Sequence, residues 1–346
     1  VKEFPHIPGI DFSGTVVESQ NENYKKGDEI ISTGWRVGEI YFGGYSQYAK
    51  VKGEFLVKKP KDLTSRQAMI LGTAGITALQ CAFAVKAREE LLLQKKVVDV
   101  IVTGASGGVG SIAVMILTKL NCNVTAVSGK KENSDYLKSL GAKNLINTAD
   151  LDKEARPLDK GLYDGAVDTV GGNILSNVLP HIRDKGIVAA CGNANHIKLN
   201  TTVMPFIIRG VKLWGIDSVS VSTKRREFLW DEASKLVDFE LLDKSIKAAL
   251  SFESFSWWGK TKSVPPAWIS IGIPKWRIIL AVHSIIGFSG GAVAGPIIGA
   301  ILDLNGGTDN PSAWQFAFIT MGLGSLLVFI IQYRSILSNK LRSKIN

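Results

Sequence analysis

The sequence is poor in the residues that build disulfides and metal sites. It has three cysteines and four histidines, scattered without a CxxC pair or a metal-ligand spacing. Unpaired, widely spaced cysteines are typical of the reduced thiols of a cytoplasmic chain, so no disulfide framework is expected. The scattered histidines give no support to a zinc site. We therefore expect no metal, and a cytoplasmic location for this part of the chain.

The chain also lacks a secretory signal peptide at its start, which does not begin with Met. The formal net charge of +10 could indicate nucleic-acid binding. However, residues 252–346 hold much of this excess, because basic residues clearly outnumber acidic ones there. A membrane-flanking or solvated basic surface explains that distribution better, so no nucleic-acid partner is expected.

Hydrophobic patterning divides the rest into two kinds of structure. Residues 9–57 contain short β-rich runs separated by glycine and Lys/Asp turns, which predicts a small β domain. From residue 98 onward strands and helices alternate, which predicts an α/β fold, a doubly wound parallel sheet with helices on both faces. Strands are expected at 9–17, 29–32, 45–57, 98–103, 124–127, 145–146, 165–170, 186–191 and 211–216, and helices at 65–69, 74–85, 111–120, 134–140, 173–179, 202–208 and 225–237.

The glycine-rich run VTGASGGVG carries the clearest functional signal. Gly104, Gly107 and Gly110 recur every third residue, with Gly108 between them, after an apolar strand and before an apolar-periodic helix. Glycines there allow a tight turn and close approach of a pyrophosphate to the helix N-terminus. A plain turn is the alternative, but the strand before and the helix after favour dinucleotide binding. The loops after residues 102, 127, 170, 191 and 216 share the carboxyl edge of the sheet and form the candidate site.

The end of the second strand bears on the choice of cofactor. An NAD site usually has Asp or Glu there, to bind the ribose 2′-hydroxyl. This strand instead ends in Val127-Ser128-Gly129-Lys130-Lys131. A hydroxyl and two cations suit a 2′-phosphate, so NADPH is favoured over NADH. The alternative is that the two lysines are only a solvated helix start.

Several motifs in order resemble one family. VTGASGGVGSIAV, DYLKSLGA, AVDTVGG and TTVMPFIIRGV are similar to the medium-chain dehydrogenase/reductase superfamily. With PGIDFSGTV, TGWRVGE, GGYSQYAKVKG and GTAGITA, the likeness narrows to the zinc-independent acryloyl-CoA reductase/quinone oxidoreductase branch. It covers about residues 1 to 250. It implies a GroES-like β domain beside a Rossmann domain, NADPH as hydride donor, and an enoyl-CoA or quinone as substrate whose activated C=C bond is reduced.

The resemblance also implies roles for particular residues. Zinc-dependent relatives would have His-Glu where this chain has Ile10-Asp11. Lys130 stands where the family usually has Arg, and Arg36 where it usually has Gly. The catalytic residues and the proton donor stay unassigned. The cofactor-binding residues implied are Thr77 by the nicotinamide; Gly104, Ser106, Gly107, Gly108, Val109 and Gly110 at the pyrophosphate; Ser128 and Lys130 at the 2′-phosphate; Tyr136 near the adenosine; and Val170, Gly171, Cys191 and Gly192 near the nicotinamide.

Two long uncharged runs, 278–302 and 313–333, follow residue 250. Each is long enough for a transmembrane helix, and a glycine every fourth residue in the first suits close helix packing in lipid. Basic residues flank the pair and acids lie between, so both ends would be cytoplasmic in an inner or plasma membrane. The pair resembles the last two helices of a major facilitator superfamily transporter, with His283 as an intramembrane functional candidate. Two buried helices of a soluble domain are the alternative.

The sequence thus predicts four parts. These are a partial GroES-like β domain at 1–70, an NADPH-binding Rossmann domain at 71–250, a junction at 251–275, and a transmembrane hairpin with a basic tail at 276–346. The resemblance implies further family residues before Val1 and a closing stretch after Leu250. We expect a reductase whose activity truncation impairs. The alternative is a chimeric NADPH-binding remnant fused to a transporter fragment, without turnover. A homodimer is left open.

Overall fold

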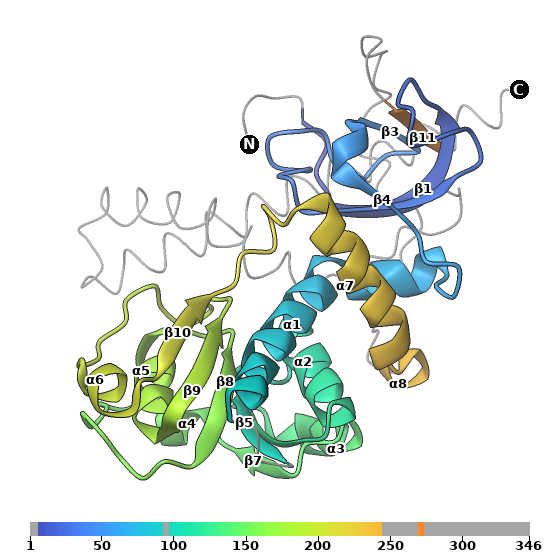
Figure 1. The fold of residues 1–346 in the computed structure, drawn as a ribbon. Coiled ribbons are helices and arrows are strands. Elements are labelled where there is room, and N and C mark those ends of the chain that lie inside the picture. The colour runs from blue at the N-terminus through green and yellow to red at the C-terminus, as the bar shows by residue number, and fades with distance from the viewer. Residues whose placement is uncertain (1–5, 93–96, 244–268, 273–346) are drawn as a thin grey trace, which may run out of the picture. The chain divides into compact units, whose positions relative to one another are not determined.

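The computed structural model describes residues 6–92, 97–243 and 269–272 (Figure 1). The chain divides into two compact units, Val1–His283 and Ser284–Asn346, and every described residue belongs to the first. The predicted membrane spans at 278–302 and 313–333, the transporter-like hairpin, His283 and most of the junction lie outside the described residues. They stay predictions.

One sheet is parallel throughout and has the strand order β10-β9-β8-β5-β6-β7. Numbered along the domain from β5, this is the 3-2-1-4-5-6 order of doubly wound dinucleotide-binding folds. The order reverses between β5 and β8, and folds of this kind bind their ligands at that point, beyond the carboxyl ends of the strands. The strands are β5 Val98–Val102, β6 Cys122–Val127, β7 Asn144–Ile146, β8 Tyr163–Asp168, β9 Ile182–Ala190 and β10 Lys212–Gly215.

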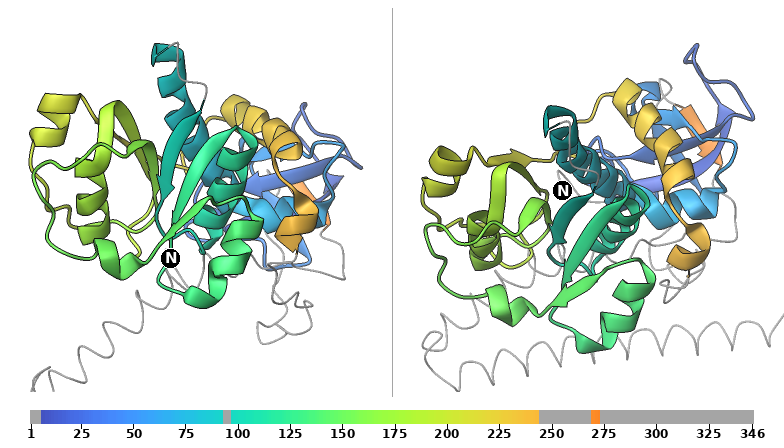
Figure 2. Two further views of the ribbon diagram at one scale, coloured as in Figure 1. Left: turned by 90° about the horizontal axis from the view of Figure 1, so that it is seen from below. Right: turned by 60° about the horizontal axis from the view of Figure 1, so that its bottom comes forward.

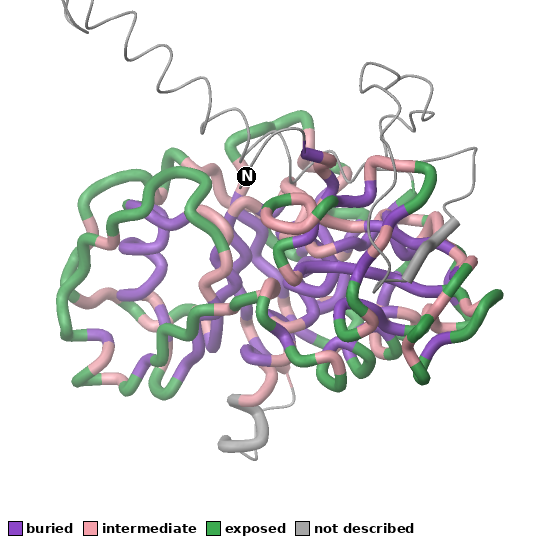
Figure 3. The backbone as a smooth tube through the Cα atoms, turned by 90° about the horizontal axis from the view of Figure 1, so that it is seen from above, coloured by how far each residue is buried: buried purple, intermediate pink, exposed green. Residues whose placement is uncertain are grey.

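Helices cover both faces of this sheet, as the alternation of β5 shows. Val100 and Val102 point into a core shared with the first two helices, whereas Ile101 points into a second core with Leu175 and Val178. Figures 1 and 2 show α1 and α5 on opposite sides of these strands, and Figure 3 shows in purple how much of the backbone belongs to buried residues. The helices are α1 Ser65–Leu92, α2 Gly108–Lys119, α3 Ser134–Ser139, α4 Thr148–Leu151, α5 Gly172–Val178, α6 Met204–Arg209, α7 Thr223–Leu236 and α8 Phe239–Asp243.

The second sheet is antiparallel, in the order β3-β11-β1-β2-β4. Its strands are β1 Asp11–Glu18, β2 Glu29–Thr33, β3 Tyr48–Val51, β4 Leu56–Lys58 and β11 Ile269–Gly272. The single run predicted at 45–57 is two strands, because a 3-10 turn, Gly53–Phe55, separates β3 from β4. Phe12, Val16, Ile30 and Leu56 belong to the small core of this sheet.

Strand β11 was not predicted. The sequence indicates a junction over 251–275, whereas residues 269–272 pair with β1 on one side and β3 on the other. Four residues are too few for a periodicity signal, and the partners lie more than two hundred positions earlier. The β sheet is therefore continued by a segment beyond residue 250.

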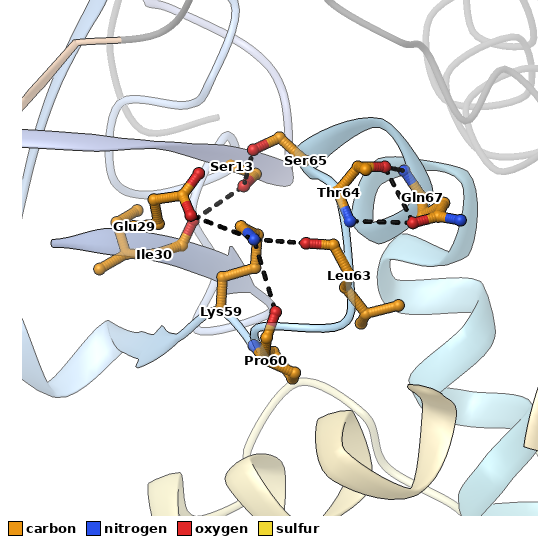
Figure 4. A network of polar contacts seen from close by, with 9 residues as sticks. All are labelled: Ser13, Glu29, Ile30, Lys59, Pro60, Leu63, Thr64, Ser65 and Gln67. Carbon is orange, nitrogen blue, oxygen red and sulfur yellow. Dashed lines mark hydrogen bonds and ion pairs between the residues drawn. The ribbon is translucent and has the colours of Figure 1, made fainter. Parts of the chain in front are cut away.

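Polar contacts connect the start of α1 to the antiparallel sheet (Figure 4). The Lys59 ammonium donates to the carbonyls of Pro60 and Leu63 and pairs with Glu29 at 3.3 Å. The Ser13 hydroxyl on β1 donates to the Ser65 hydroxyl at 3.1 Å. Thr64 and Gln67 cap the helix reciprocally, because each accepts the other's backbone N–H at 2.9 and 3.1 Å.

Helix α1 is broken at Gly72, whose backbone angles are φ 49° and ψ −151°. This confirms the two helical segments predicted on either side of Gly72-Thr73. The stretch Ser65–Ala87 is long and apolar enough to cross a membrane, and an 18-residue window within it has a mean hydropathy of 1.7, but 78% of that window is buried within the protein. It packs in the larger core as a helix of the α/β domain.

Other predicted elements are present, with shifted ends. Helix α2 begins at Gly108 rather than at residue 111, because the glycine motif continues into its first turn. Strand β9 begins four residues before the predicted start, at Ile182. Helices α4 and α8 are short and lacked a periodic signal.

Candidate functional site

The glycine turn between β5 and α2 has the close packing that a phosphate cradle needs. Gly104 has φ 58°, and a Cβ there would lie 2.2 Å from the Thr169 hydroxyl. A Cβ on Gly110 would lie 2.3 Å from the carbonyl oxygen of Gly104. Only glycine fits either position, because side chains would collide with backbone or with the next loop. The glycine turn therefore packs the first residues of α2 directly against the end of β5.

Helix α2 points its N-terminus at this turn. Gly107 is the extended residue before the helix, and the Ser111 amide is the first to donate back to it, at 2.9 Å. The amides of Gly108, Val109 and Gly110 precede that bond, and such first-turn amides have no acceptor inside a helix. Together with the helix dipole they form an anion-binding end. The predicted pyrophosphate residues are thus brought together.

Ser106 and Ser128 meet although they come from different loops. Their hydroxyls lie 3.1 Å apart, and Ser128 also accepts the Lys130 amide at 3.3 Å. The Ala105 amide donates to the Val127 carbonyl at 3.0 Å, which holds the two loops in register. Lys130 is exposed at the rim. The candidate 2′-phosphate residues therefore adjoin the glycine turn.

Asp168, at the end of β8, braces the neighbouring strand end. Its carboxylate accepts the Thr103 hydroxyl at 2.6 Å and the Gly171 amide at 2.9 Å. Complete burial removes it from water and raises its pKa, which these hydrogen bonds only partly oppose. The Thr169 hydroxyl returns a hydrogen bond to the Thr103 carbonyl at 3.0 Å. The brace fixes where the loops after β5 and β8 begin.

The loops after β8 and β9 are interlocked. The Cys191 amide donates to the Asp168 carbonyl at 2.9 Å, and the Asn195 amide donates to the Val170 carbonyl at 2.8 Å. A Cβ on Gly192 would lie 2.4 Å from the Thr169 carbonyl oxygen, and Gly171 has φ 70°. The structure therefore brings Val170, Gly171, Cys191 and Gly192 together, as the resemblance implies.

Thr77 lies on the same face of α1 as Cys81, which is close to Cys191 of this loop pair. Cys81 is four residues later on α1, so both side chains lie on one face. The Cys191 thiol donates to the Asp168 carbonyl at 3.4 Å, and its proximity to Cys81 together with burial raises the pKa of Cys81. Thr77, 4% exposed, thus belongs to the surface of α1 that faces the loop after β9.

Tyr136 is placed differently from the other implied residues. It lies on α3, partly buried against the larger core. Its carbonyl accepts the Ser139 hydroxyl and the Leu140 amide. Its side chain is therefore engaged in packing, and its role near an adenosine stays a prediction.

Arg36 also departs from the family pattern in a way that the backbone explains. Its φ is 59°, in the left-handed region that glycine adopts most easily. The neighbouring Trp35 has φ 56°. By resemblance, the usual residue at position 36 is Gly, and glycine is the residue that adopts the observed backbone conformation most easily.

The described residues offer no ready metal site. Within 6–92, 97–243 and 269–272, no group of three or more His, Cys, Asp or Glu side chains is arranged to hold a metal ion. Asp11, which stands at the Glu of the zinc-dependent His-Glu pair, has its carboxylate occupied by Thr73. No catalytic step is therefore assigned to a metal.

Sequence reasoning missed Thr103, Asp168 and Asp11. The first two are polar residues at the carboxyl ends of β5 and β8, and the strand order would have revealed them as neighbours. Asp11 gave no such signal, since its partner Thr73 lies in another domain.

A 3-2-1-4-5-6 parallel sheet with a glycine turn at its switch point defines a dinucleotide-binding protein. Residues 1–61 match the alcohol dehydrogenase GroES-like domain family, and residues 108–235 match the zinc-binding dehydrogenase family. The acrylyl-CoA reductase AcuI of Ruegeria pomeroyi is 45% identical over 250 residues, which cover 72% of this chain and 75% of that protein. The chain therefore belongs to the medium-chain dehydrogenase/reductase superfamily, among the relatives of acrylyl-CoA reductase.

Two solved structures have the same fold. The yhdH oxidoreductase of Salmonella enterica, in complex with NADP, has a TM-score of 0.67 and 46% identity, over 70% of this chain and 74% of that one. The yhfP protein of Bacillus subtilis, with NAD bound, has a TM-score of 0.66 and 42% identity, over 71% and 74%. The name of yhfP places it among the quinone oxidoreductases. Both structures hold a nicotinamide dinucleotide.

Proposed function

We propose that this chain binds NADPH and reduces an activated carbon–carbon double bond in a small molecule. An enoyl thioester of the acrylyl-CoA class is the proposed acceptor, with a quinone as the alternative. The observation that carries the proposal is the glycine turn at the switch point, in a chain of this family. A Cβ at Gly104 or Gly110 would fill the space in which the turn packs, so the cradle is fitted to close backbone approach.

The chain's own residues would bind and orient rather than react. The amides of Gly108, Val109 and Gly110 would hold the pyrophosphate, and Ser128 with Lys130 the 2′-phosphate. When bound, NADPH supplies a hydride for the β-carbon of the acceptor. Thr77 and the backbone at Val170-Gly171 and Cys191-Gly192 would fix the nicotinamide ring, and orientation of this kind is a large part of a hydride-transfer rate.

Cofactor choice can be tested at the end of β6. In the Ser128→Asp variant, NADPH affinity is expected to fall about 10- to 100-fold, because a hydrogen bond to a charged group is lost and a carboxylate faces the phosphate. NADH should bind as well as before or better, since the carboxylate can accept from the ribose 2′-hydroxyl. The affinities for NADPH and for NADH are measured by titrating each nucleotide with the full chain and following its fluorescence.

Lys130→Arg should tighten NADPH, because the planar fork can bind the phosphate bidentately. Lys143→Met is the matched control, an exposed lysine on the loop before β7 that should change nothing. Equal loss of NADH and NADPH in the Ser128 variant would contradict the 2′-phosphate assignment. Saturable NADPH binding without consumption of any enoyl thioester or quinone would favour the remnant hypothesis.

We also propose that two copies associate through α6 and β10. Strand β10 is the edge of the parallel sheet and is exposed along its whole length. Large apolar side chains gather there, and a second copy related by a two-fold axis would cover both edges at once. They are Val203, Met204, Ile207, Ile208, Leu213 and Trp214.

A further inference from the structure

A carboxylate from the antiparallel sheet caps the second half of α1. The Thr73 amide donates to Asp11 Oδ2 at 2.8 Å, and the Thr73 hydroxyl donates to Asp11 Oδ1 at 2.5 Å. Asp11 is the first residue of β1, whereas Thr73 follows the break in α1. A side chain of one sheet therefore fixes the start of a helix of the other domain.

Gly72 makes this approach possible. A Cβ at Gly72 would lie 2.5 Å from Asp11 Oδ2, and φ 49° with ψ −151° is a conformation that few other residues adopt. The break and the carboxylate thus depend on each other. A continuous helix through residue 72 would leave no place for the carboxylate at the Thr73 amide.

The cap leads directly to Thr77. The Thr77 hydroxyl donates to the Thr73 carbonyl at 2.7 Å, so its proton is directed along the helix and its oxygen remains able to accept a hydrogen bond. One turn later Cys81 contacts Cys191 of the loop after β9. The hydrogen-bonded series Asp11–Thr73–Thr77 therefore ends at the surface where the nicotinamide is proposed to lie.

We propose that Asp11 is a positioning residue of the reductase, whose ionised carboxylate holds the turn from Thr73 to Thr77, and with it the Thr77 hydroxyl, in place for the nicotinamide. The proposal rests on the proposed function for its effect on turnover. The expected effect on the turn from Thr73 to Thr77 is independent of the proposed function.

The charge state of Asp11 changes in a useful pH range. Removal from water raises its pKa to about 6, against the lowering effects of the Thr73 hydrogen bonds and of the Arg226 charge on α7. On protonation one oxygen becomes a donor, so the carboxyl can no longer accept both Thr73 bonds with the same strength. The turn should therefore be held firmly above pH 6 and loosened below it.

Two other titratable groups that interact with Asp11, Arg226 and Tyr45, keep their charge state across that range. Burial lowers the pKa of Arg226 to about 10, and burial with the Asp11 charge raises that of Tyr45 to about 12. Across the strand pair Asp11 faces Thr33, which does not titrate. His196 pairs with Gly171 through the backbone, so a His196 variant is included as a control.

The test compares six variants of the full chain, which are His196→Gln, Asp11→Ala and four others. Asp11→Asn keeps the shape and one acceptor oxygen for the Thr73 amide, but carries no charge. Thr73→Val removes the hydroxyl and keeps the amide, and Thr73→Ser keeps both donors and should restore the wild-type behaviour. Asp28→Asn is the matched control, another aspartate of the β domain that accepts a backbone amide, from Lys25 at 3.1 Å.

For turnover, kcat of the wild type should fall below pH 6, and this acid limb should disappear in Asp11→Asn. At pH 8, kcat of Asp11→Asn and Thr73→Val should be about 10- to 100-fold lower, as expected when a hydrogen bond to a charged group is lost from an orienting network. The KM for NADPH should stay unchanged, because the phosphate-binding turn is separate. His196→Gln should keep the limb, and Asp28→Asn should match the wild type.

Amide hydrogen exchange gives a readout that needs no turnover. The Thr73 amide should exchange slowly at pH 8 in the wild type and faster, relative to its intrinsic rate, at pH 5 and in Asp11→Ala. If the wild type binds no NADPH but Thr73 shows this protection, the proposed function fails and the positioning of the turn stands. If protection and the kcat profile of Asp11→Asn equal those of the wild type, or His196→Gln abolishes the limb, the positioning role is overturned.

Discussion

At the scale of single residues, the backbone explains one departure from the family more fully than the side chain does. Arg36 holds a left-handed conformation, and its exposed side chain makes only a 3.6 Å ion pair with Glu39. A non-glycine residue in this region costs about 1–2 kcal/mol, whereas an exposed ion pair contributes about 0–1 kcal/mol. The position therefore favours glycine on balance.

Arg36→Gly should accordingly stabilise the protein by about 0.5–1 kcal/mol, after the larger unfolded-state entropy of glycine is allowed for. Urea unfolding of the two proteins side by side measures the difference. Lys26→Gly is the control, because Lys26 is exposed and does not have a positive φ, so glycine there should destabilise. A loss of stability in both variants would show that the turn at 35–36 is not strained.

Single residues also show how far the candidate site could be predicted. The glycines could be predicted from the sequence, because Gly104 and Gly110 are required by the close packing within a single turn. Ser128 was identifiable as the end of a strand, and the structure places it beside Ser106. Asp11 could not be found from the sequence, since its function depends on Thr73, sixty-two positions away and in another domain.

At the scale of elements, the long periodic segments were predicted, whereas three of the short elements were missed. Strands β5, β6 and β8 are buried on both faces and form apolar runs that the sequence displays. By contrast, α4, α8 and β11 have at most five residues, too few to show a period. The observed start of a helix differs from the predicted one where glycine lies inside the first turn. Glycine is a poor helix former, so Gly108 was placed before α2, whereas the helix begins at that residue.

Strand β11 permits a sharp element-level prediction. Ser270 pairs with Glu18 of β1 and with Lys50 of β3, so the strand is bonded on both sides. Proline there removes a ladder donor and cannot be accommodated in the middle of a sheet. Ser270→Pro should lower the free energy of unfolding by about 3 kcal/mol or more and raise amide exchange in β1 and β3.

Ser270→Thr is the matched control, because a β-branched residue is favoured in strands and should leave stability nearly unchanged. Far-UV circular dichroism during urea unfolding compares the two variants. Equal stability of the proline and threonine proteins would mean that residues 269–272 do not contribute to the sheet in solution.

At the scale of the whole molecule, the two domains are joined by a buried cation. Arg226 on α7 is 1% exposed and donates to the Thr33 hydroxyl at 3.0 Å and to the Ser218 and Val219 carbonyls at 3.3 Å. A Cβ on Gly34 would meet the same guanidinium and carbonyls at about 3 Å. The β sheet and the α/β domain therefore share one polar interface, in which Asp11 and Arg226 hold opposite charges near each other.

The association of two copies is the property of the whole molecule that can be tested most directly. Trp214 is 51% exposed on the edge strand β10, and Ile207 and Ile208 of the preceding helix α6 are also exposed. A two-fold axis at this edge would bring β10 against its own copy and bury these side chains on both sides. Trp214→Glu would then place two carboxylates in the contact, so the variant should be a monomer where the wild type is a dimer.

Sedimentation velocity at micromolar concentration measures the change, and circular dichroism confirms that the variant is folded. Tyr48→Glu is the matched control, because Tyr48 is 64% exposed on β3, the edge of the other sheet, and its replacement should leave the dimer intact. Cofactor affinity should be equal in all three proteins, since the phosphate-binding turn follows β5 in the middle of the sheet and β10 is its far edge. A wild type that sediments as a monomer, or a Trp214→Glu variant that stays dimeric, would show that this apolar edge serves another contact.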